Sequence, residues 1–439
     1  MNIQIITTGW ILFGILLASV LSAATNAQKP NIILIMSDDL GAEGLACYNS
    51  TIYTTPNLDR LAANGAVFEN AYATPLCTPT RVMIMSGMYP NRTGFNTLIQ
   101  RVEKGARMPK ELKTIGNYFQ ENGYKTAIAG KWQLGRFDVY PNQPVEHGFD
   151  QYCMWKWFFK SDERNSRYYA PQIWEDGASN DGDQTVFGPD VYTDYLLDFI
   201  EANKDEPYFI YFPMALVHSP FIAPPSLKEL AYSKYHDGMD EDTKNFGHMI
   251  TYMDMLIGRI AEKVEETGQA ENTLIIFTAD NGCHKFITSR LGEKDLQGGK
   301  GKMTEAGCRV PLIFYWPGKV PPAQREEFFS LVDILPTLAS ITDIEIDPVD
   351  GMDLSHNLFG KQGKDRDHVF MYFKKEAFVR DQRFRLNEKG ELFDIPITSD
   401  ESRYSEKIST NPEHEAAKDR LQKLLNDYLA IPQMQFSSD

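Results

Sequence analysis

The chain has 439 residues, of which 42% are hydrophobic and 24% are charged, and its formal net charge is −16. This length predicts more than one core, and the composition is that of a globular protein, which excludes a low-complexity chain. The acidic balance argues against nucleic acid or an anionic membrane surface as a partner. An anionic substrate is compatible with this charge only if cations gather in a pocket.

The N-terminus has the pattern of an export signal. Trp10–Leu21 is almost entirely apolar, and Ser22–Ala27 offers an Ala-x-Ala-like cleavage site. The apolar run is shorter than the roughly 20 residues of a membrane span. No Lys or Arg precedes Lys29, so an uncleaved membrane anchor stays open as an alternative. We expect residues 1–27 to be a signal peptide and the protein to be exported, to a periplasm or out of the cell.

From Asn31 onward, short apolar runs alternate with amphipathic segments. This alternation predicts an α/β fold with a large, mostly parallel sheet flanked by helices. Continuous apolar runs predict strands that are buried on both faces, at Asn31–Met36, Thr126–Ala129, Tyr208–Ala215, Thr273–Ala279 and Pro311–Trp316. Helices are expected between them, at Leu58–Ala63, Leu112–Asn122 and Phe246–Glu266. The aromatic stretch Tyr152–Phe159 suits a core hairpin, which we favour, or a surface that stacks on a sugar.

The pattern changes after about Thr342, where a turn-rich stretch begins. Short strand-like segments then predict a small antiparallel sheet, at His368–Phe373, Ala377–Arg380, Phe384–Leu386 and Leu392–Ile395. A last helix is expected with Asn411 as its cap and Pro412 at its first position. We therefore expect a catalytic α/β domain over residues 28–345 and a smaller α+β domain over residues 346–439.

Polar residues follow directly after four of the buried runs. These residues are Asp38–Asp39, Lys131, His218 and Asp280–Asn281. Each has an ordinary structural explanation alone, such as a helix cap or a turn. Ligands bind beyond the carboxyl ends of strands in open α/β sheets, so four such coincidences predict one shared site. Three carboxylates and an amide oxygen suit Ca²⁺ or Mg²⁺ rather than zinc, and the residues alone do not decide between the two ions.

The stretch Cys77-Thr78-Pro79-Thr80-Arg81 resembles the signature of the sulfatases, in which the leading cysteine is oxidised to formylglycine. Thr80 stands where that family usually has Ser or Ala, and a cysteine at such a turn is also consistent with a small buried hydrophobe. Further motifs strengthen the resemblance and cover most of the mature chain, namely Thr55–Leu61, Gly130–Gly135, His218–Pro220, Gly298–Gly301 with Glu305, Ser330–Thr337 and Gly390–Asp394. The chain thus resembles the sulfatases of the alkaline phosphatase-like superfamily.

The resemblance implies a set of catalytic roles. Cys77, converted to formylglycine by a maturation enzyme, attacks sulfur, and Arg81 holds the hydrated aldehyde from one helical turn away. Lys131 and Lys300 contact the sulfate oxygens, where charge develops in the transition state. His218 lies near the leaving oxygen and protonates it.

The resemblance also implies a metal site. It favours Ca²⁺ over Mg²⁺, with Asp38, Asp39, Asp280 and Asn281 as ligands and residue 77 completing the coordination. The ion would polarise a sulfate oxygen and hold the nucleophile.

Gln133 departs from the family pattern, because sulfatases usually have histidine at this position. An amide cannot accept a proton at working pH, and that histidine is thought to help release sulfate. We hypothesise that Gln133 retains a hydrogen bond to residue 77 while another base takes the proton. His284, three residues beyond Asn281, or a metal-bound carboxylate is the candidate base.

These features predict an exported sulfatase that hydrolyses the sulfate ester of a sulfated small molecule or carbohydrate. A phosphonate or phosphate ester hydrolase of the same superfamily is one alternative. A catalytically silent protein that binds sulfated glycans is another, and Gln133 is the feature that supports it. If Cys77 is oxidised, four of the five cysteines remain, either as disulfides or as free buried thiols.

Overall fold

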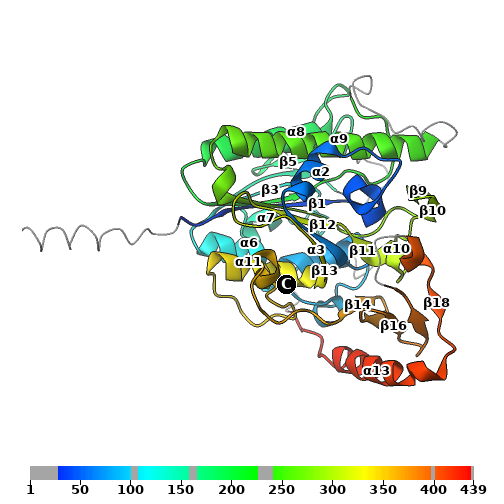
Figure 1. Ribbon diagram of the computed structural model, residues 1–439. Helices are drawn as coiled ribbons and strands as arrows, with labels where there is room; N and C mark the ends of the chain where they lie inside the picture. Colours follow the sequence, from blue (N-terminus) through cyan, green and yellow to red (C-terminus); the bar gives the residue numbers. More distant parts are fainter. Residues whose placement is uncertain (1–27, 100–106, 158–165, 226–240, 397–400, 437–439) are drawn as a thin grey trace, which may run out of the picture.

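The computed structural model describes residues 28–99, 107–157, 166–225, 241–396 and 401–436 (Figure 1). The expected signal peptide, residues 1–27, lies outside the described residues. None of the helices in the described ranges has the length and hydropathy that a membrane span requires. All five cysteines are free, so the alternative of free thiols holds.

The main element is an 11-stranded mixed sheet. Four of its strands are fully or almost fully buried, run parallel and lie side by side in the order β8 (Thr273–Ala279), β1 (Asn31–Ser37), β7 (Tyr208–Pro213) and β3 (Lys125–Gly130). Continuous apolar sequence produces this arrangement, because both faces of such strands are covered. The remaining strands are β2 (Ala66–Tyr72), β4 (Gln151–Trp155), β5 (Ile173–Glu175), β6 (Ala178–Ser179), β11 (Arg309–Val310), β12 (Leu312–Tyr315) and β13 (Ala323–Ser330).

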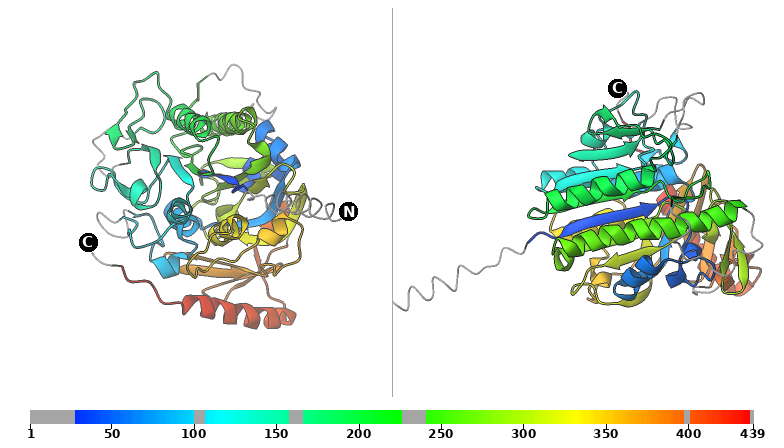
Figure 2. Two further views of the ribbon diagram at one scale, coloured as in Figure 1. Left: turned by 90° about the vertical axis from the view of Figure 1, so that its left-hand side faces the viewer. Right: turned by 90° about the horizontal axis from the view of Figure 1, so that it is seen from above.

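Helices cover both faces of this sheet (Figures 1 and 2). One face carries α2 (Pro56–Ala63), α8 (Gly188–Ala202) and α9 (Glu241–Glu266), and α8 and α9 pack side by side. The opposite face carries α3 (Cys77–Ser86), α6 (Ile115–Glu121) and α11 (Ile334–Thr342). Four short helices belong to this part of the fold, namely α4 (Pro90–Thr93), α7 (Gln143–Glu146), α10 (Glu305–Cys308) and α12 (Ser355–Leu358). A separate hairpin consists of β9 (Thr288–Leu291) and β10 (Lys294–Gln297).

A five-stranded antiparallel sheet forms the C-terminal part of the chain. Its strands are β14 (Val369–Phe373), β15 (Glu376–Arg380), β16 (Phe384–Asn387), β17 (Leu392–Asp394) and β18 (Lys407–Ile408). The last helix, α13 (Glu415–Leu429), packs on β15 and β16 through Leu421 and Leu425. The fold class expected from the sequence, a large mixed sheet with helices and a small antiparallel sheet with a helix, is confirmed.

The expected start of the last helix is wrong by three residues. Pro412–His414 forms a 3₁₀ turn, and α13 begins at Glu415. The His414 amide donates to the Asn411 carbonyl, 3.1 Å away, which closes the tighter i→i+3 turn. The strands β2 and β13 and the helix α8 were not expected from the sequence.

Candidate active site

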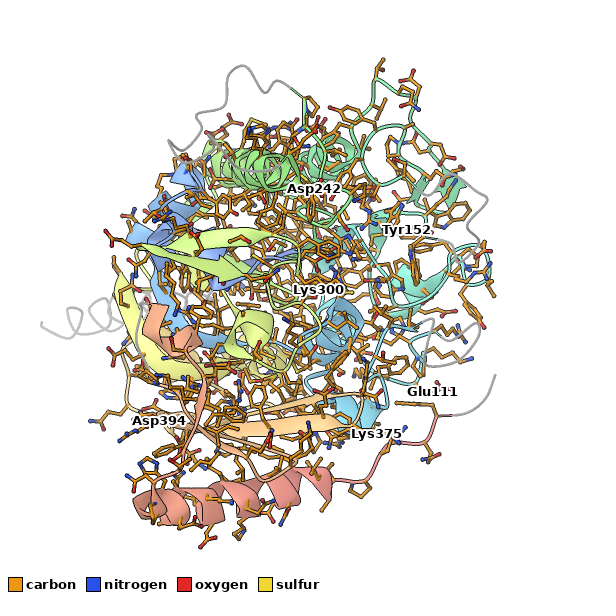
Figure 3. The ribbon with its side chains drawn as sticks, turned by 90° about the vertical axis from the view of Figure 1, so that its right-hand side faces the viewer. Glu111, Tyr152, Asp242, Lys300, Lys375 and Asp394 are labelled. Atoms are coloured by element: carbon orange, nitrogen blue, oxygen red, sulfur yellow. The ribbon has the colours of Figure 1, made fainter. Side chains whose placement is uncertain are left out.

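The four polar clusters lie at one edge of the main sheet. They follow β8, β1, β7 and β3, which are neighbours, and all four strands point to this edge. Ser37 is paired with Ala279, so Asp38 and Asp280 leave adjacent strand ends at the same level. Figure 3 looks onto this edge, with Lys300 between Asp242 of α9 and the C-terminal sheet.

Each carboxylate at this edge is paired with a cation. Lys131 Nζ lies 2.5 Å from Asp38 Oδ2, and Lys300 Nζ lies 2.6 Å from Asp39 Oδ2. Arg81 Nη2 lies 2.7 Å from Asp280 Oδ2 and 3.7 Å from Asp38 Oδ1. The three acids are fully buried, so the pairs are shielded from solvent and their attraction is strong.

Cys77 is the first residue of α3, and its side chain is buried at this edge. Arg81 follows one turn later, and its Nη1 donates to the Lys131 carbonyl at 2.7 Å. Thr80, which departs from the family pattern, hydrogen-bonds to Thr74 in the preceding turn. The hydroxyl at position 80 thus stabilises the turn that precedes Cys77.

The Cys77 thiol faces both lysines and the acidic residues. Burial raises its pKa, and this effect outweighs the attraction of Lys131 and Lys300 for a thiolate. An unmodified thiol here is therefore protonated at neutral pH and is a weak nucleophile.

Lys300 is held by the glycine-rich loop before α10. Its amide donates to the Cys283 carbonyl at 3.0 Å, and the Gly301 amide donates to the Pro75 carbonyl at 2.7 Å. The loop therefore joins the chain just before Cys77 to the chain just after Asn281. Burial opposes the charge of Lys300, but Asp39 outweighs it and raises the lysine pKa above its usual value.

Within the described parts of the chain, two oxygens in the acidic cluster accept no hydrogen bond. These are Asp38 Oδ1 and Asn281 Oδ1, both buried. The Asn281 amide nitrogen donates to Asp39 Oδ1 at 2.8 Å, which turns its oxygen away from that carboxylate. Asp39 has a positive φ of 65°, a left-handed backbone conformation that is uncommon for residues other than glycine.

The acids differ in their ionisation. Burial alone would raise the pKa of Asp38, but Lys131, His218 and Arg81 outweigh it and hold that pKa well below its usual range. Burial and the Asp38 carboxylate raise the pKa of Asp280 to about 7, in spite of Arg81. The raised pKa shows that burial and the neighbouring Asp38 disfavour the charged form of Asp280, and a cation placed beside both carboxylates would favour that form.

His218 lies at the edge of the same cluster. Its Nε2 is 3.7 Å from Asp39 Oδ2, and its Nδ1 donates to the Ser219 carbonyl at 2.7 Å. Burial lowers the pKa of His218 to about 3, against the attraction of Asp39. Tyr168 holds this segment, because its hydroxyl donates to the His218 carbonyl at 2.5 Å. The sequence offered no motif that marks Tyr168.

Gln133 and His284 differ in their surroundings. Gln133 is buried with a positive φ of 54°, and no donor of the described residues bonds to its Oε1. His284 is partly exposed, packs against Phe221 and Phe286, and accepts a bond at Nδ1 from the Phe286 amide. Burial lowers the pKa of His284, and Asp39 opposes that shift. His284 thus lies within electrostatic reach of the cluster.

The aromatic stretch expected as a core hairpin begins with strand β4. Tyr152 and Trp155 are 3% and 2% exposed, and β4 pairs in parallel with β3 and antiparallel with β5. The part of the stretch from residue 158 lies outside the described residues. Tyr152, at the side of the view in Figure 3, therefore belongs to the core.

We expect the stability of the protein to decrease as pH falls from 6.5 towards 4, because of His147. This histidine is buried beside Trp132, and burial lowers its pKa to about 4. In that range the unfolded chain binds a proton that the folded chain excludes, so stability rises with pH, by about 3 kcal/mol at most. The variant His147→Phe should flatten this slope in urea unfolding. If the free energy of unfolding of His147→Phe changed with pH below 6.5 as steeply as that of the wild type, the expectation would be wrong.

Comparison with known proteins identifies the family. A family model described as Sulfatase matches residues 30–344. Arylsulfatase A of Homo sapiens is 31% identical over 380 residues, covering 81% of this chain and 73% of that protein. N-acetylgalactosamine-6-sulfatase of Canis lupus familiaris is 31% identical, covering 83% and 72%. The crystal structure of Ps i-CgsB has 26% sequence identity and a TM-score of 0.80 over 92% of this chain and 94% of that one. The chain belongs to the sulfatase family, whose members are sulfuric ester hydrolases of the alkaline phosphatase-like superfamily.

Proposed function

We propose that the protein hydrolyses the sulfate ester of a sulfated carbohydrate, with residue 77 as formylglycine and a divalent metal ion in the acidic cluster. One observation carries this proposal. The buried side chain of Cys77 lies among two lysines, an arginine and two carboxylates from separate segments, and Asp39 and His218 extend the same cluster. Sugar sulfates are suggested as substrates by relatives such as the N-acetylgalactosamine-6-sulfatase.

The acidic cluster fits Ca²⁺ better than a softer metal. Asp38, Asp39, Asp280 and Asn281 would hold the ion, together with residue 77, and all offer hard oxygen ligands. The unpartnered oxygens of Asp38 and Asn281 and the raised pKa of Asp280 support a cation at this place. When bound, the ion supplies positive charge that polarises a sulfate oxygen.

Residue 77 supplies the nucleophile in this proposal. A maturation enzyme converts Cys77 to formylglycine, and the hydrated aldehyde offers a hydroxyl for attack on sulfur. The protonation of the unmodified thiol supports the need for this conversion. Arg81, one turn along α3, orients the side chain at position 77 and keeps its positive charge, because its partner Asp280 is within 2.7 Å.

The cations hold the sulfate group. Lys131 and Lys300 bring two ammonium groups to the side of the cluster where Cys77 lies, and they stabilise the negative charge that develops on the sulfate oxygens. His218 has its Nδ1 proton committed to the Ser219 carbonyl, so Nε2 is the atom that faces the site. A bound sulfate favours the protonated imidazole, which then donates a proton from Nε2 to the leaving oxygen.

Mass spectrometry and parallel assays test this function. The peptide that contains residue 77 should be about 18 Da lighter than its unmodified form when the protein comes from its native host. A sulfate monoester should be hydrolysed faster than a phosphate monoester or diester. An unmodified cysteine with no turnover would instead support a silent sulfoglycan-binding protein, and a preference for phosphate would support the alternative hydrolase.

Removal of the metal ion should abolish most of the activity. Dialysis against a chelator is expected to lower kcat/KM by about 100-fold or more, because the site loses the positive charge that polarises a sulfate oxygen. Ca²⁺ should restore the rate and raise the melting temperature, since an ion that binds only the folded state stabilises it. Full activity in the chelated protein, with metal content measured as zero, would contradict the metal assignment.

Gln133→His should change turnover and its pH profile, because a histidine there adds a group that can accept a proton. We expect kcat to change by about 3-fold or more, with a new ionisation in the profile of kcat against pH. His284→Gln is the matched variant, and it should lower kcat if His284 is the base that replaces the missing histidine. A profile identical to the wild type in Gln133→His would refute the idea that this substitution alters the mechanism.

The organisation of the mature chain is also proposed. Residues 1–27 would be removed on export, residues 28–345 would form the catalytic domain and residues 346–439 the smaller one. The change from the main sheet, which ends with β13, to the antiparallel sheet, which starts at β14, supports a boundary between them. N-terminal sequencing of the exported protein would test the cleavage site.

A further inference from the structure

Two hydrogen-bond donors beside the active site have no acceptor among the residues that the structure describes. They are the indole nitrogen of Trp155 and the Nη1 atom of Arg167, and both atoms are buried. The guanidinium of Arg167 lies 4.2 Å from the Trp155 ring and 5.9 Å from the Tyr168 ring. Within the described ranges, its neighbours are thus aromatic rings rather than a carboxylate. A buried donor without an acceptor is unfavourable, so this pair is suited to an acceptor from outside the chain.

Both residues lie next to the catalytic groups. Gly130 of β3 is paired with Met154 of β4, so Trp155 stands level with Lys131 at the edge where the strands end. Arg167 precedes Tyr168, whose hydroxyl donates to the His218 carbonyl and also lies 2.9 Å from the Ala215 carbonyl oxygen. The two unpaired donors therefore belong to segments that flank Lys131 on one side and His218 on the other.

The chemistry of the donors selects an anion. A guanidinium stacked on an indole is held flat, and its two terminal nitrogens have the geometry for two parallel bonds to a carboxylate or a sulfate. An indole nitrogen is a donor only and also requires an acceptor. A neutral hydroxyl would satisfy one donor but would leave the positive charge of Arg167 unbalanced.

We propose that Trp155 and Arg167 form a second anion subsite, which binds a carboxylate or a second sulfate group of the substrate beside the scissile sulfate. This inference rests on the proposed function, because it assumes a sulfated sugar in the adjoining site. The subsite would make the enzyme selective for sugars that carry two negative charges. The second anion comes either from the same sugar ring or from a neighbouring uronate.

Calorimetry with three ligands tests the subsite. The calcium-loaded Cys77→Ser protein is titrated with N-acetylgalactosamine 6-sulfate, with N-acetylgalactosamine 4,6-disulfate and with the disaccharide of glucuronate and N-acetylgalactosamine 6-sulfate. At least one ligand with two anions should bind 10-fold or more tightly than the monosulfate. The one that gains identifies the second group as sulfate or carboxylate.

Arg167→Gln in the same background should remove this difference, so that the dissociation constants agree within about 3-fold. Trp155→Phe keeps the aromatic stack but loses the N–H, and it should reduce the difference without removing it. The matched control is Arg259→Gln, which breaks an exposed ion pair with Asp194 and should leave the difference intact. Melting curves of each variant verify folding.

Two results would overturn the subsite. Either the three ligands bind the parent protein equally, or Arg167→Gln weakens all three by the same factor. Hydrolysis of 4-nitrophenyl sulfate by the formylglycine form tests the proposed function separately. Turnover without a preference for two anions would refute only the subsite, whereas a preference without turnover would retain the subsite and refute hydrolysis.

Discussion

Replacing Cys77 with alanine is expected to lower kcat for sulfate ester hydrolysis by about four orders of magnitude or more. The reason is that alanine cannot be converted to an aldehyde, and the described part of the site offers no other activated nucleophile at this position. Burial also keeps the unmodified thiol protonated, so residual thiol chemistry is not expected to compensate. The measurement is kcat for a sulfate monoester at saturating concentration, with calcium present.

The matched control is Cys47→Ala, which removes a second free cysteine that is only partly buried. Its kcat should stay within about 2-fold of the wild type, because Cys47 lies outside the group of charges that surrounds Cys77. Cys77→Ala protein must also unfold with the wild-type midpoint in urea. A variant that is folded and retains more than 1% of the activity would exclude residue 77 as the nucleophile.

Replacing Glu305 with alanine is expected to lower the free energy of unfolding by about 3–5 kcal/mol. Glu305 is 1% exposed and receives bonds from the Tyr72 hydroxyl and from Nε and Nη2 of Arg403, at 3.0–3.2 Å. Arg380 Nε lies 3.5 Å from the same carboxylate. Loss of the acid removes the carboxylate that pairs with two buried arginines, Arg380 of β15 and Arg403 of the segment before β18.

The stabilisation from Glu305 and its two arginines should depend on pH, and the direction of that dependence follows from the pKa of Glu305. Burial would raise the pKa of Glu305, but Arg380 and Arg403 outweigh burial and lower it below its usual value. The stabilisation is therefore present above the ordinary pKa of a glutamate, about 4.3, and is lost as pH falls below it. Glu305→Gln should show a smaller loss at neutral pH than Glu305→Ala, because it keeps the shape of the side chain.

Urea unfolding measures these losses, and Glu265→Ala is the control. Glu265 pairs with Arg60 at 2.9 Å on the surface, where an ion pair contributes about 0–1 kcal/mol. Equal losses for Glu305→Ala and Glu265→Ala would contradict the assigned role of Glu305. The Glu305 network also lies directly after the loop that holds Lys300, so folded Glu305→Gln protein should show a higher KM for the sulfate ester.

The sequence predicted the central strands well, because their apolar runs have a physical cause that acts locally. Burial on both faces requires continuous apolar sequence, as in Thr273–Ala279, and the structure gives that stretch the same bounds. The strand β2 was not predicted, because Glu69 and Asn70 interrupt its apolar sequence. Asn70 is buried and bonds to the Glu326 carbonyl and to Arg403, partners that are distant in the sequence.

The residues of the site were predictable for the same reason. Polar residues that follow buried parallel strands gather at one edge of the sheet. Asp38, Lys131 and Asp280 do so directly after their strands, whereas His218 is the fifth residue after the end of β7. Arg167 and Tyr168 were not predictable, since they lie on an irregular segment whose path depends on tertiary contacts. The run of a cation and two aromatic residues, Arg167-Tyr168-Tyr169, was the only signal there.

A crystal structure of the enzyme grown with Ca²⁺ would show whether the acidic cluster holds a metal ion beside the nucleophile. We expect one ion bound by oxygens of Asp38, Asp39, Asp280 and Asn281, with density for a hydrated aldehyde at position 77 facing it. A calcium-soaked crystal in which Lys131 and Lys300 still pair with the aspartates, with no ion between them, would rule out this metal site.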